Sequence, residues 1–304
     1  MDWISGIQRA IDYIEEHLTE EIDLAEAAEC ACSSAFHFLR IFGIVCGYTP
    51  GEYVRMRRLS LAGADILEKR CNVTEAALHY GYETPESFSR AFRNFHGILP
   101  SQVKQGCSLK AFSPISVKLD KQGGNTMNYK IEKRPAGLLV GYKKRFRGVP
   151  YGAEREKQED RFFRTTRAKQ RLLRGASDTP EIDYCVIKNI DEEGYDFYIA
   201  YNLDEWSRTE MFNPAVTGVD FMDKLGFEQI EIPPQTYAVF ETPKMRRPIM
   251  DYIALRQQIV TEWLPSTDYV FADAPEIVAM HWPVNGKEAK QRYIEICLPV
   301  ENKF

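Results

Sequence analysis

The sequence lacks the features that would place the protein in or across a membrane. It contains no run of about 18 consecutive apolar residues, the length that crosses a bilayer as a helix. Its N-terminal stretch, MDWISGIQRAIDYIEEHL, carries acidic side chains where a signal peptide has a basic region followed by an apolar one. We therefore expect a cytoplasmic protein that makes no membrane contact.

Cysteines are too irregularly spaced to indicate a disulfide framework or a zinc site. There are seven, an odd number. The one close pair, Cys30 and Cys32, lacks the second pair or the histidines that zinc requires. The sequence also lacks a phosphate-binding loop and a recognisable nucleophile–base pair. We expect reduced thiols, no metal or cofactor, and no enzymatic activity.

Positive charge is scarce as well, which excludes a uniformly basic surface. The net charge is −5 over 304 residues, and a protein that coats nucleic acid without regard to sequence is normally basic. The distribution is uneven, because acidic residues gather before residue 30. The arginines of the N-terminal region that follow residue 30 include Arg55, Arg57, Arg58, Arg90 and Arg93. Local basic patches are therefore compatible with the composition.

What the sequence does contain is a pattern written twice, F-x-R-x-F-x-x-x-x-G-x-x-P, beginning at Phe38 and at Phe88. In the second copy Thr84 and Pro85 predict a helix N-cap followed by a first-turn proline, and Gly97 predicts the helix end. One face of this predicted helix is apolar: Phe88, Ala91, Phe92 and Phe95. The other face is polar: Glu86, Arg90 and Arg93.

The first copy predicts a similar helix, with Phe36 and Arg40 facing outward and an apolar face of Phe38, Ile41, Phe42 and Val45. Each copy follows a short segment containing Glu-Ala-Ala, at 26–28 and 75–77. Two short helices joined by a tight turn form a helix-turn-helix unit. The connector, residues 50–69, would span roughly 30 Å as a helix, near the ~34 Å between successive major-groove faces of DNA. Its arginines Arg55, Arg57 and Arg58 are candidates for phosphate contacts.

Residues 4–106 resemble the DNA-binding domain of the AraC/XylS family of transcription regulators. The resemblance rests on EYVRMRRLSLAGADIL and VTEAALHYGYETPESFSRAFRNFHGILPSQV. It implies a seven-helix monomeric module with two helix-turn-helix units, double-stranded DNA as partner and RNA polymerase as a candidate partner. The positions that face bases in the family fall on Phe36, Leu39, Arg40, Pro85, Glu86 and Arg90, to which the polar face adds Arg93. The first turn departs from the family, with Cys32 in place of a glycine.

After about residue 110 the periodicity changes. A short strand is expected over 112–119, and Lys121–Asn125 reads as a flexible joint. We expect a helical domain at 1–110, a strand and linker at 111–126, and a second domain at 127–304. The second domain reads as two β-β-α-β-β units, with Pro135 and Pro234 at matching positions. The predicted fold is therefore an all-α tandem helix-turn-helix domain followed by an α+β domain, whose antiparallel sheet carries two helices on one face.

Glu295 is an unusual residue for the strand on which we expect it, because it alternates with isoleucines. A carboxylate in such a place is costly unless it is paired, hydrogen-bonded or wet. Two interpretations stay open. In the first, Glu295 has a structural role and either pairs with a local arginine or lies on an open sheet face. In the second, it binds a cationic or hydrogen-bond-donating ligand. Aromatic residues that could surround it, and could attract an organic cation, are Tyr198, Trp206, Tyr237, Phe240, Trp282 and Tyr293.

Residues 127–302 resemble the GyrI-like effector-binding domain of Rob-type and BmrR-type regulators, on IPPQTYAVFET, EWLPSTDYVFADAPEIVAMH and YIEICLPV. The family's central pocket glutamate falls on Glu295. The resemblance implies an amphipathic, often cationic, small-molecule effector such as a drug or toxin. The sequence thus predicts a ligand-responsive transcription regulator. Two alternatives remain open: a GyrI-like hydrolase of reactive toxins fused to a DNA-binding module, and a constitutive DNA binder whose second domain binds a protein.

Overall fold

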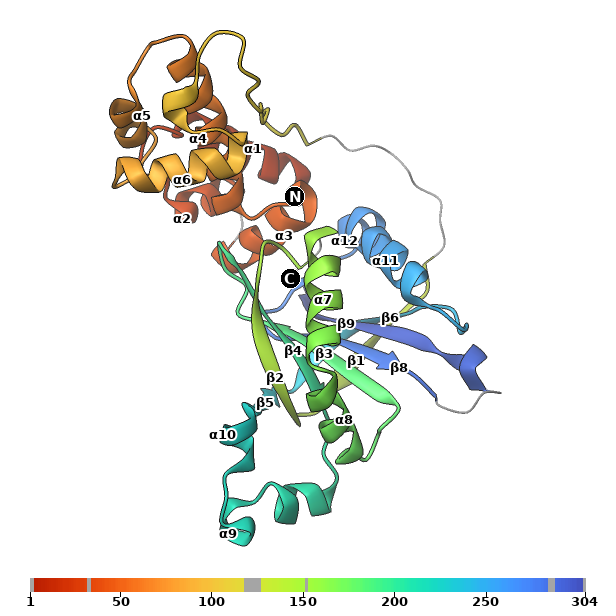
Figure 1. Ribbon diagram of the computed structural model, residues 1–304. Helices are drawn as coiled ribbons and strands as arrows, with labels where there is room; N and C mark the ends of the chain where they lie inside the picture. Colours follow the sequence, from red (N-terminus) through yellow and green to blue (C-terminus); the bar gives the residue numbers. More distant parts are fainter. Residues whose placement is uncertain (1–2, 32–33, 118–126, 151–152, 284–287, 303–304) are drawn as a thin grey trace. The chain divides into compact units, whose positions relative to one another are not determined.

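The chain forms two compact units, Met1–Asp120 and Lys121–Phe304 (Figure 1). The computed structural model describes residues 3–31, 34–117, 127–150, 153–283 and 288–302. The predicted flexible joint Lys121–Asn125 and the turn residue Cys32 lie outside the described residues.

The first unit is helical, as predicted. Its elements are α1 (Trp3–Glu16), α2 (Leu24–Cys30), α3 (Ala35–Cys46), α4 (Pro50–Leu67), α5 (Val73–His79), α6 (Pro85–His96) and the short 3₁₀ helix η1 (Pro100–Gln102). The predicted signals for α6 are confirmed, since the Thr84 hydroxyl accepts from Ser87 N–H at 3.1 Å and Pro85 opens the helix. Gly97 ends it with φ 86°, a left-handed conformation that favours glycine.

Helices α2–α3 and α5–α6 form the two helix-turn-helix units, and each repeat phenylalanine pair lies in its own core. Phe38 and Phe42 belong to one buried cluster, and Phe88 and Phe92 to another. The connecting helix α4 contributes Tyr53 to the first cluster and Leu59 to the second, so it fixes the two units relative to each other. No single described helix is long and apolar enough to cross a membrane. Helices α2 and α3 together reach the required length and apolar composition, but they are bent by 77° relative to each other.

Two of the three connector arginines hold the helical unit together. Arg57 donates to both carboxylate oxygens of Glu15, at 2.7 and 2.8 Å, and also to the backbone carbonyl of Phe112. Arg58 donates to the carbonyls of Leu18 and Glu20, at 2.7 and 2.5 Å. The donors that these bonds use are spent inside the unit, so the candidacy of Arg57 and Arg58 for phosphate contacts gains no support from the structure. Arg55 is exposed.

The predicted strand at 112–119 is wrong over the part that the structure describes. Residues 112–117 are extended but belong to no sheet, because no strand is available beside them in the helical unit. Their backbone N–H groups donate instead to side chains: Phe112 to Ser60, Ile115 to Tyr53 and Val117 to Gln8. This segment packs on the core of α1 and α4, so the helical unit continues past the boundary expected at residue 110.

The second unit is built on one antiparallel sheet in the order β1-β6-β9-β8-β3-β4-β2-β5, with β7 beside β9. The strands are β1 (Tyr129–Arg134), β2 (Gly137–Arg147), β3 (Ile182–Lys188), β4 (Gly194–Tyr201), β5 (Glu228–Ile232), β6 (Gln235–Glu241), β7 (Tyr269–Phe271), β8 (Glu276–His281) and β9 (Tyr293–Asn302). The order reads as two related halves that meet where β3 pairs with β8. The predicted duplication and fold class are confirmed.

The two halves exchange their first strands. β1 pairs with β6 of the second half, and β5 pairs with β2 of the first. Gly141 on β2 allows close packing against β4, because a Cβ there would lie 2.4 Å from the Ile199 carbonyl oxygen. The exchange makes each half incomplete without the other, so the duplicated domain folds as one sheet.

The long helical segments of the second unit, one from each half, lie on one face of this sheet, whereas α9 and α10 extend beyond its end (Figure 1). The helix expected at 156–174 is two helices, α7 (Ala153–Thr165) and α8 (Arg167–Gly175), with a break at Thr166. The hydroxyls of Thr165 and Thr166 both donate to the carbonyl of Phe162 there. The second half supplies α11 (Ile249–Gln258), which continues through the π-helical segment η3 (Ile259–Trp263) into α12 (Leu264–Ser266). Two short helices, α9 (Pro214–Thr217) and α10 (Phe221–Leu225), follow the π-helical segment η2 (Ser207–Met211) between the halves.

We predict that acid weakens the helical unit through His96. This side chain is buried, with Nε2 2.9 Å from the Leu59 carbonyl oxygen and Nδ1 accepting from Lys110 N–H at 3.2 Å. Burial lowers the pKa of His96, although the hydrogen bond to Leu59 opposes the change. Its contribution to stability is therefore present above the unfolded-state pKa of about 6.5 and is lost as pH falls through the lower folded-state pKa.

The melting temperature of the helical unit, followed by circular dichroism between pH 7 and pH 5, should fall less steeply with acid in His96→Gln than in the wild type. The comparison uses the pH slopes and not the absolute stabilities, because the substitution itself disturbs a packed site. Parallel slopes for the two proteins would contradict the role given to His96.

Candidate functional sites

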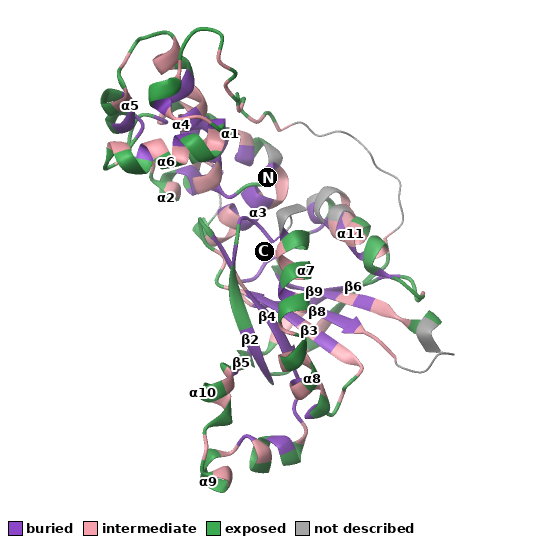
Figure 2. Cartoon of the chain, viewed as in Figure 1, coloured by how far each residue is buried: buried purple, intermediate pink, exposed green. Residues whose placement is uncertain are grey.

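Helix α6 presents a polar surface on the side opposite its core. Glu86, Arg90 and Arg93 are exposed, and Pro85 is half-buried, whereas Phe88 and Phe92 are fully buried (Figure 2). Because Thr84 already caps the helix, capping does not require Glu86. The three exposed side chains follow one another at i, i+4 and i+7 and so lie along a single stripe of the helix. This stripe is the predicted polar face.

Helix α3 offers a different surface from the one predicted. Phe36 and Leu39 are half-buried, but Arg40 is only 1% exposed. Its guanidinium lies 6.0 Å from the ring centroid of Phe36, so the two side chains expected to face outward pack against each other. The prediction that Arg40 faces solvent is therefore wrong in this conformation, and the accessible part of α3 is mainly apolar.

In the second unit, Glu295 lies on the sheet face that carries tyrosines. Tyr198 and Tyr237 belong to the buried cluster there, and Tyr184 packs against it. Tyr293 and Glu295 share this face with Cys297, a member of the cluster, because the three residues occupy every second position of β9. We call this surface the tyrosine face: Tyr184, Tyr198, Tyr237, Tyr293 and Glu295.

The carboxylate of Glu295 is paired. Arg134 Nη2 lies 2.9 Å from Glu295 Oε1 and also donates to Glu132 at 3.0 Å. The Cys297 thiol donates to the same oxygen of Glu295 at 3.3 Å. Of the two interpretations left open, pairing with a local arginine is the one present here. The Glu295 side chain nevertheless stays 13% exposed, so it is reachable from solvent.

The tyrosines around Glu295 are held by further contacts. Arg134 stacks 5.9 Å from the centroid of the Tyr237 ring, whose hydroxyl donates to the Pro275 carbonyl at 3.2 Å. Lys143 lies 5.5 Å from the Tyr198 ring, and Tyr293 stacks on His281 with ring centroids 4.1 Å apart. Two cations of the protein itself, Arg134 and Lys143, thus already stack on two of these rings. The expected organic cation would have to stack on the tyrosine rings in the same way.

Three residues predicted to surround Glu295 do not do so, namely Phe240, Trp206 and Trp282, the last of which lines the cavity described next. Phe240 follows Val239 of the tyrosine-face cluster, so its side chain points to the opposite sheet face, where its ring lies 5.0 Å from that of Trp263. Trp206 is 64% exposed and directly precedes η2, outside the sheet. All three predictions are wrong, because an aromatic residue type does not reveal the face to which strand alternation directs it.

On the helix face of the sheet, a cavity of about 480 Å³ opens between α7 and α11. Its apolar lining consists of Phe163, Ile249, Tyr252, Ile253, Met280 and Trp282. Four carboxylates complete it: Glu156, Glu159, Asp160 and Asp183. Trp282, expected beside Glu295, lies here instead. The cavity is at the junction of the two halves, since Asp183 of β3 and Met280 of β8 are paired residues.

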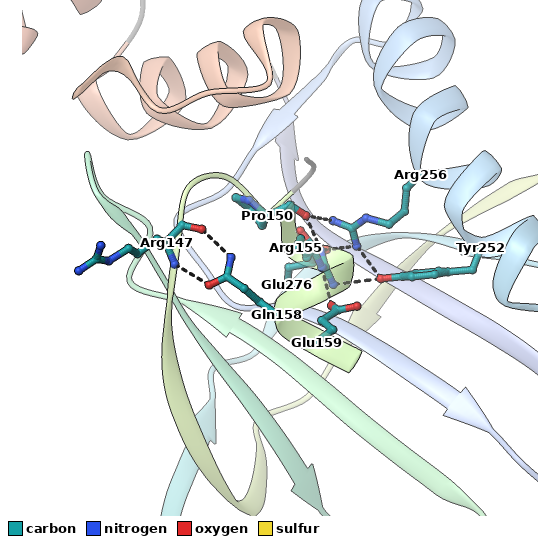
Figure 3. Close-up of polar contacts among 8 residues, drawn as sticks. All are labelled: Arg147, Pro150, Arg155, Gln158, Glu159, Tyr252, Arg256 and Glu276. Atoms are coloured by element: carbon teal, nitrogen blue, oxygen red, sulfur yellow. Dashed lines mark hydrogen bonds and ion pairs between the residues drawn. The ribbon is translucent and has the colours of Figure 1, made fainter. Parts of the chain in front are cut away.

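A buried charge network fixes the two cavity helices to the sheet (Figure 3). Arg256 of α11 donates to Glu276 of β8 at 2.7 Å, and Arg155 of α7 lies 3.9 Å from the same oxygen. Both arginines also donate to the hydroxyl of Tyr252, at 3.0 and 3.1 Å, and to the carbonyl of Pro150. Arg155 makes a further ion pair with Glu159. Burial raises the pKa of Tyr252 to about 12, so its hydroxyl stays protonated and can accept both bonds.

Sequence analysis missed this network. One signal was present: Arg256 continues the apolar stripe of Ile249, Tyr252 and Ile253 on α11. An arginine at a core-facing position must find a partner, because an unpaired buried charge is very costly. The identity of the partner, Glu276, is not a local property of the sequence.

Comparison with known proteins shows what this arrangement is similar to. A family model described as a helix-turn-helix domain matches residues 27–106. Regulatory protein SoxS of Salmonella typhimurium is 32% identical over 98 residues, which cover 32% of this chain and 92% of SoxS. The chain belongs to the AraC/XylS family. The AraC-type match runs from α2 to just beyond η1 and contains both helix-turn-helix units.

Other relatives share only this DNA-binding part. YbfP of Bacillus subtilis, an uncharacterized transcriptional regulator, is 34% identical over 104 residues, so the match spans about a third of each chain, 34% of this one and 35% of YbfP. The named relatives of this AraC/XylS-family chain are transcription regulators, and no enzymatic family is indicated.

Among solved structures, SAV2435 bound to tetraphenylphosphonium is 16% identical, covering 58% of this chain and 94% of its own, at a TM-score of 0.41. A likeness at this level carries no conclusion about function.

We predict that Glu276→Gln strongly destabilises the second unit. The substitution leaves two buried guanidiniums without the carboxylate that they share, and breaking a buried ion pair in this way costs about 3–5 kcal/mol. Urea denaturation should show a lower midpoint. The matched control is Asp160→Asn, which removes an exposed i,i+4 pair with Arg164 and should change the unfolding free energy by less than about 1 kcal/mol. Equal effects of the two substitutions would refute the role of the network.

Proposed function

We propose that this AraC/XylS-family protein regulates transcription by reading specific double-stranded DNA, and that an amphipathic organic cation bound on the tyrosine face modulates this reading. The observation that carries the proposal is the exposed stripe of Glu86, Arg90 and Arg93 on α6, in the second helix of a helix-turn-helix unit. Such a helix fits the major groove, where base edges carry a sequence-specific pattern of donors and acceptors.

The two reading helices differ in chemistry, so we assign them unequal parts. Helix α6 can donate from Arg90 to guanine or phosphate and accept from cytosine through Glu86. Helix α3 offers Phe36 and Leu39, which suit apolar contacts such as a thymine methyl group. Arg40 would have to leave its present buried position to contribute. We therefore infer that α6 supplies most of the sequence specificity.

Charge at the tyrosine face favours a cationic ligand. Arg134 bridges Glu132 and Glu295, and Lys130 bridges Glu132 and Glu241, so two cations serve three carboxylates. An organic cation can replace Arg134 at Glu295 while Arg134 keeps its pair with Glu132. The surrounding tyrosine rings then supply faces that attract the cation. A ligand alters DNA binding only if it favours one arrangement of the two units over another.

Arg90→Ala should weaken binding to a specific operator by about 1–3 kcal/mol if Arg90 contacts a guanine. Operator fragments selected from random sequence, with a scrambled competitor, provide the assay by fluorescence anisotropy. Arg70→Ala is the control, because Arg70 is 65% exposed and lies outside both reading helices; its loss should have little effect. A uniform loss on all sequences would make Arg90 a phosphate contact, and no loss would sink the assignment of α6.

Glu295→Gln should lower the affinity for tetraphenylphosphonium at least tenfold, since it removes the anion that we assign to the ligand. Arg134→Gln should leave the affinity equal or higher, because it removes the competing internal cation. Calorimetric titration of the full chain measures both, and operator affinity without ligand should be unchanged in Glu295→Gln. If both substitutions lower the affinity equally, the Arg134–Glu295 pair is only structural and the proposed ligand site is wrong.

A further inference from the structure

The cavity between α7 and α11 is separate from the tyrosine face. Adjacent strand residues point to opposite faces of a sheet, and Asp183 lines the cavity while its neighbour Tyr184 packs on the tyrosine-face cluster. The same alternation separates Met280 from Ala279, the partner of Glu295. A molecule in the cavity therefore cannot touch Glu295 across the sheet.

The cavity has the size and lining of a small-molecule site. Its volume of about 480 Å³ falls within the usual range of roughly 300–1,000 Å³. Aromatic rings come from three different elements: Phe163 from α7, Tyr252 from α11, and Trp282 directly after β8. Arg292 already stacks on the Trp282 ring at 5.7 Å, although it does not line the cavity, so this ring is in a position to hold a planar cation.

The electrostatics of the lining select for positive charge. Among the residues that the structure describes, four carboxylates and no Lys, Arg or His line the cavity. The nearby guanidiniums are engaged: Arg155 with Glu159, Arg164 with Asp160, and Arg174 with Asp183. Arg256 pairs with Glu276, and neither of these two residues is among those that line the cavity. With Arg292 on the Trp282 ring as the fifth guanidinium, five carboxylates face five guanidiniums in this set. Glu156 is the lining carboxylate that none of these five guanidiniums pairs with, so its charge is the one open to a cationic ligand.

The walls of the cavity are rigid where the ligand would press on them. Tyr252 is held by both Arg155 and Arg256, and those arginines are bonded to Glu276 and Pro150. The spacing between α7 and α11 is thus fixed before a ligand arrives, which reduces the ordering cost of binding.

We propose that this cavity is a second effector site, which binds a flat aromatic monocation between α7 and α11. The cation stacks among Phe163, Tyr252 and Trp282 and neutralises the negative charge of Glu156. The site depends neither on the tyrosine face nor on DNA binding. A ligand there contacts both halves of the duplicated domain at their junction.

Berberine, a planar aromatic cation without a titrating group, is a suitable probe. Fluorescence titration of the full chain should show saturable binding that Phe163→Ala and Trp282→Ala weaken at least tenfold. Glu156→Lys should weaken it similarly, and because Glu156 is exposed this variant will not disturb the core. Glu193→Lys, at an exposed position in the β3–β4 turn, is the charge-matched control and should bind as the wild type does. Glu295→Gln should leave unchanged the component of berberine binding that Trp282→Ala removes, whatever it does to binding on the tyrosine face.

Three outcomes would overturn the proposal. Absence of saturable berberine binding would do so directly. Equal weakening by Glu156→Lys and Glu193→Lys would show a nonspecific charge effect. Loss of binding in Glu295→Gln with full binding in Trp282→Ala would place the cation on the tyrosine face, which would support the ligand site proposed for the regulator and remove the second one.

Discussion

The second unit depends on one shared carboxylate. Glu276 lies 1% exposed at the start of β8 and is the common partner of Arg155 and Arg256, which come from helices in different halves of the duplicated domain. A buried ion pair of this kind is a weak source of net stability but a strong constraint on geometry, because neither charge tolerates separation from the other. The network therefore fixes where α7 and α11 lie above the sheet, and with them the width of the cavity between them.

Internal pairing of charges also explains how a chain with a net negative charge can carry a DNA-binding domain. Arginines in the helical unit divide into those that meet internal acceptors and those that remain on the surface. Arg57 is committed to Glu15, and Arg58 to backbone carbonyls of the α1–α2 turn. Arg55, Arg90 and Arg93 remain exposed despite the net charge of −5, and two of them, Arg90 and Arg93, lie on the polar stripe of α6. Local placement of charge, and not its sum, decides what the unit can bind.

Sequence patterns predicted much of the fold because they report local physics. Helical periodicity, N-caps and terminal glycines identified α3 and α6, and the repeated Glu-Ala-Ala segments identified the helices before them. The α+β duplication was visible as two matching strand pairs at Pro135 and Pro234. Prediction failed at Phe240, Trp206 and Trp282, where residue type was taken as a guide to location, and at the described residues 112–117, where a segment outside the sheet was taken for a strand. In each case the deciding contacts lie far away in the chain.

The sequence by itself determined which residues form the helices of the helix-turn-helix units, where α6 begins and ends, and that each half of the chain is a duplication. Only the tertiary structure decided which charges are paired and which strands are exchanged. Arg134 reaches Glu295 across 161 positions and Arg155 reaches Tyr252 across 97, and β1 pairs with β6 of the other half. The physical reason is range: propensity and periodicity act over a few residues, whereas the partner of a buried charge or a strand edge is chosen by the whole packed domain.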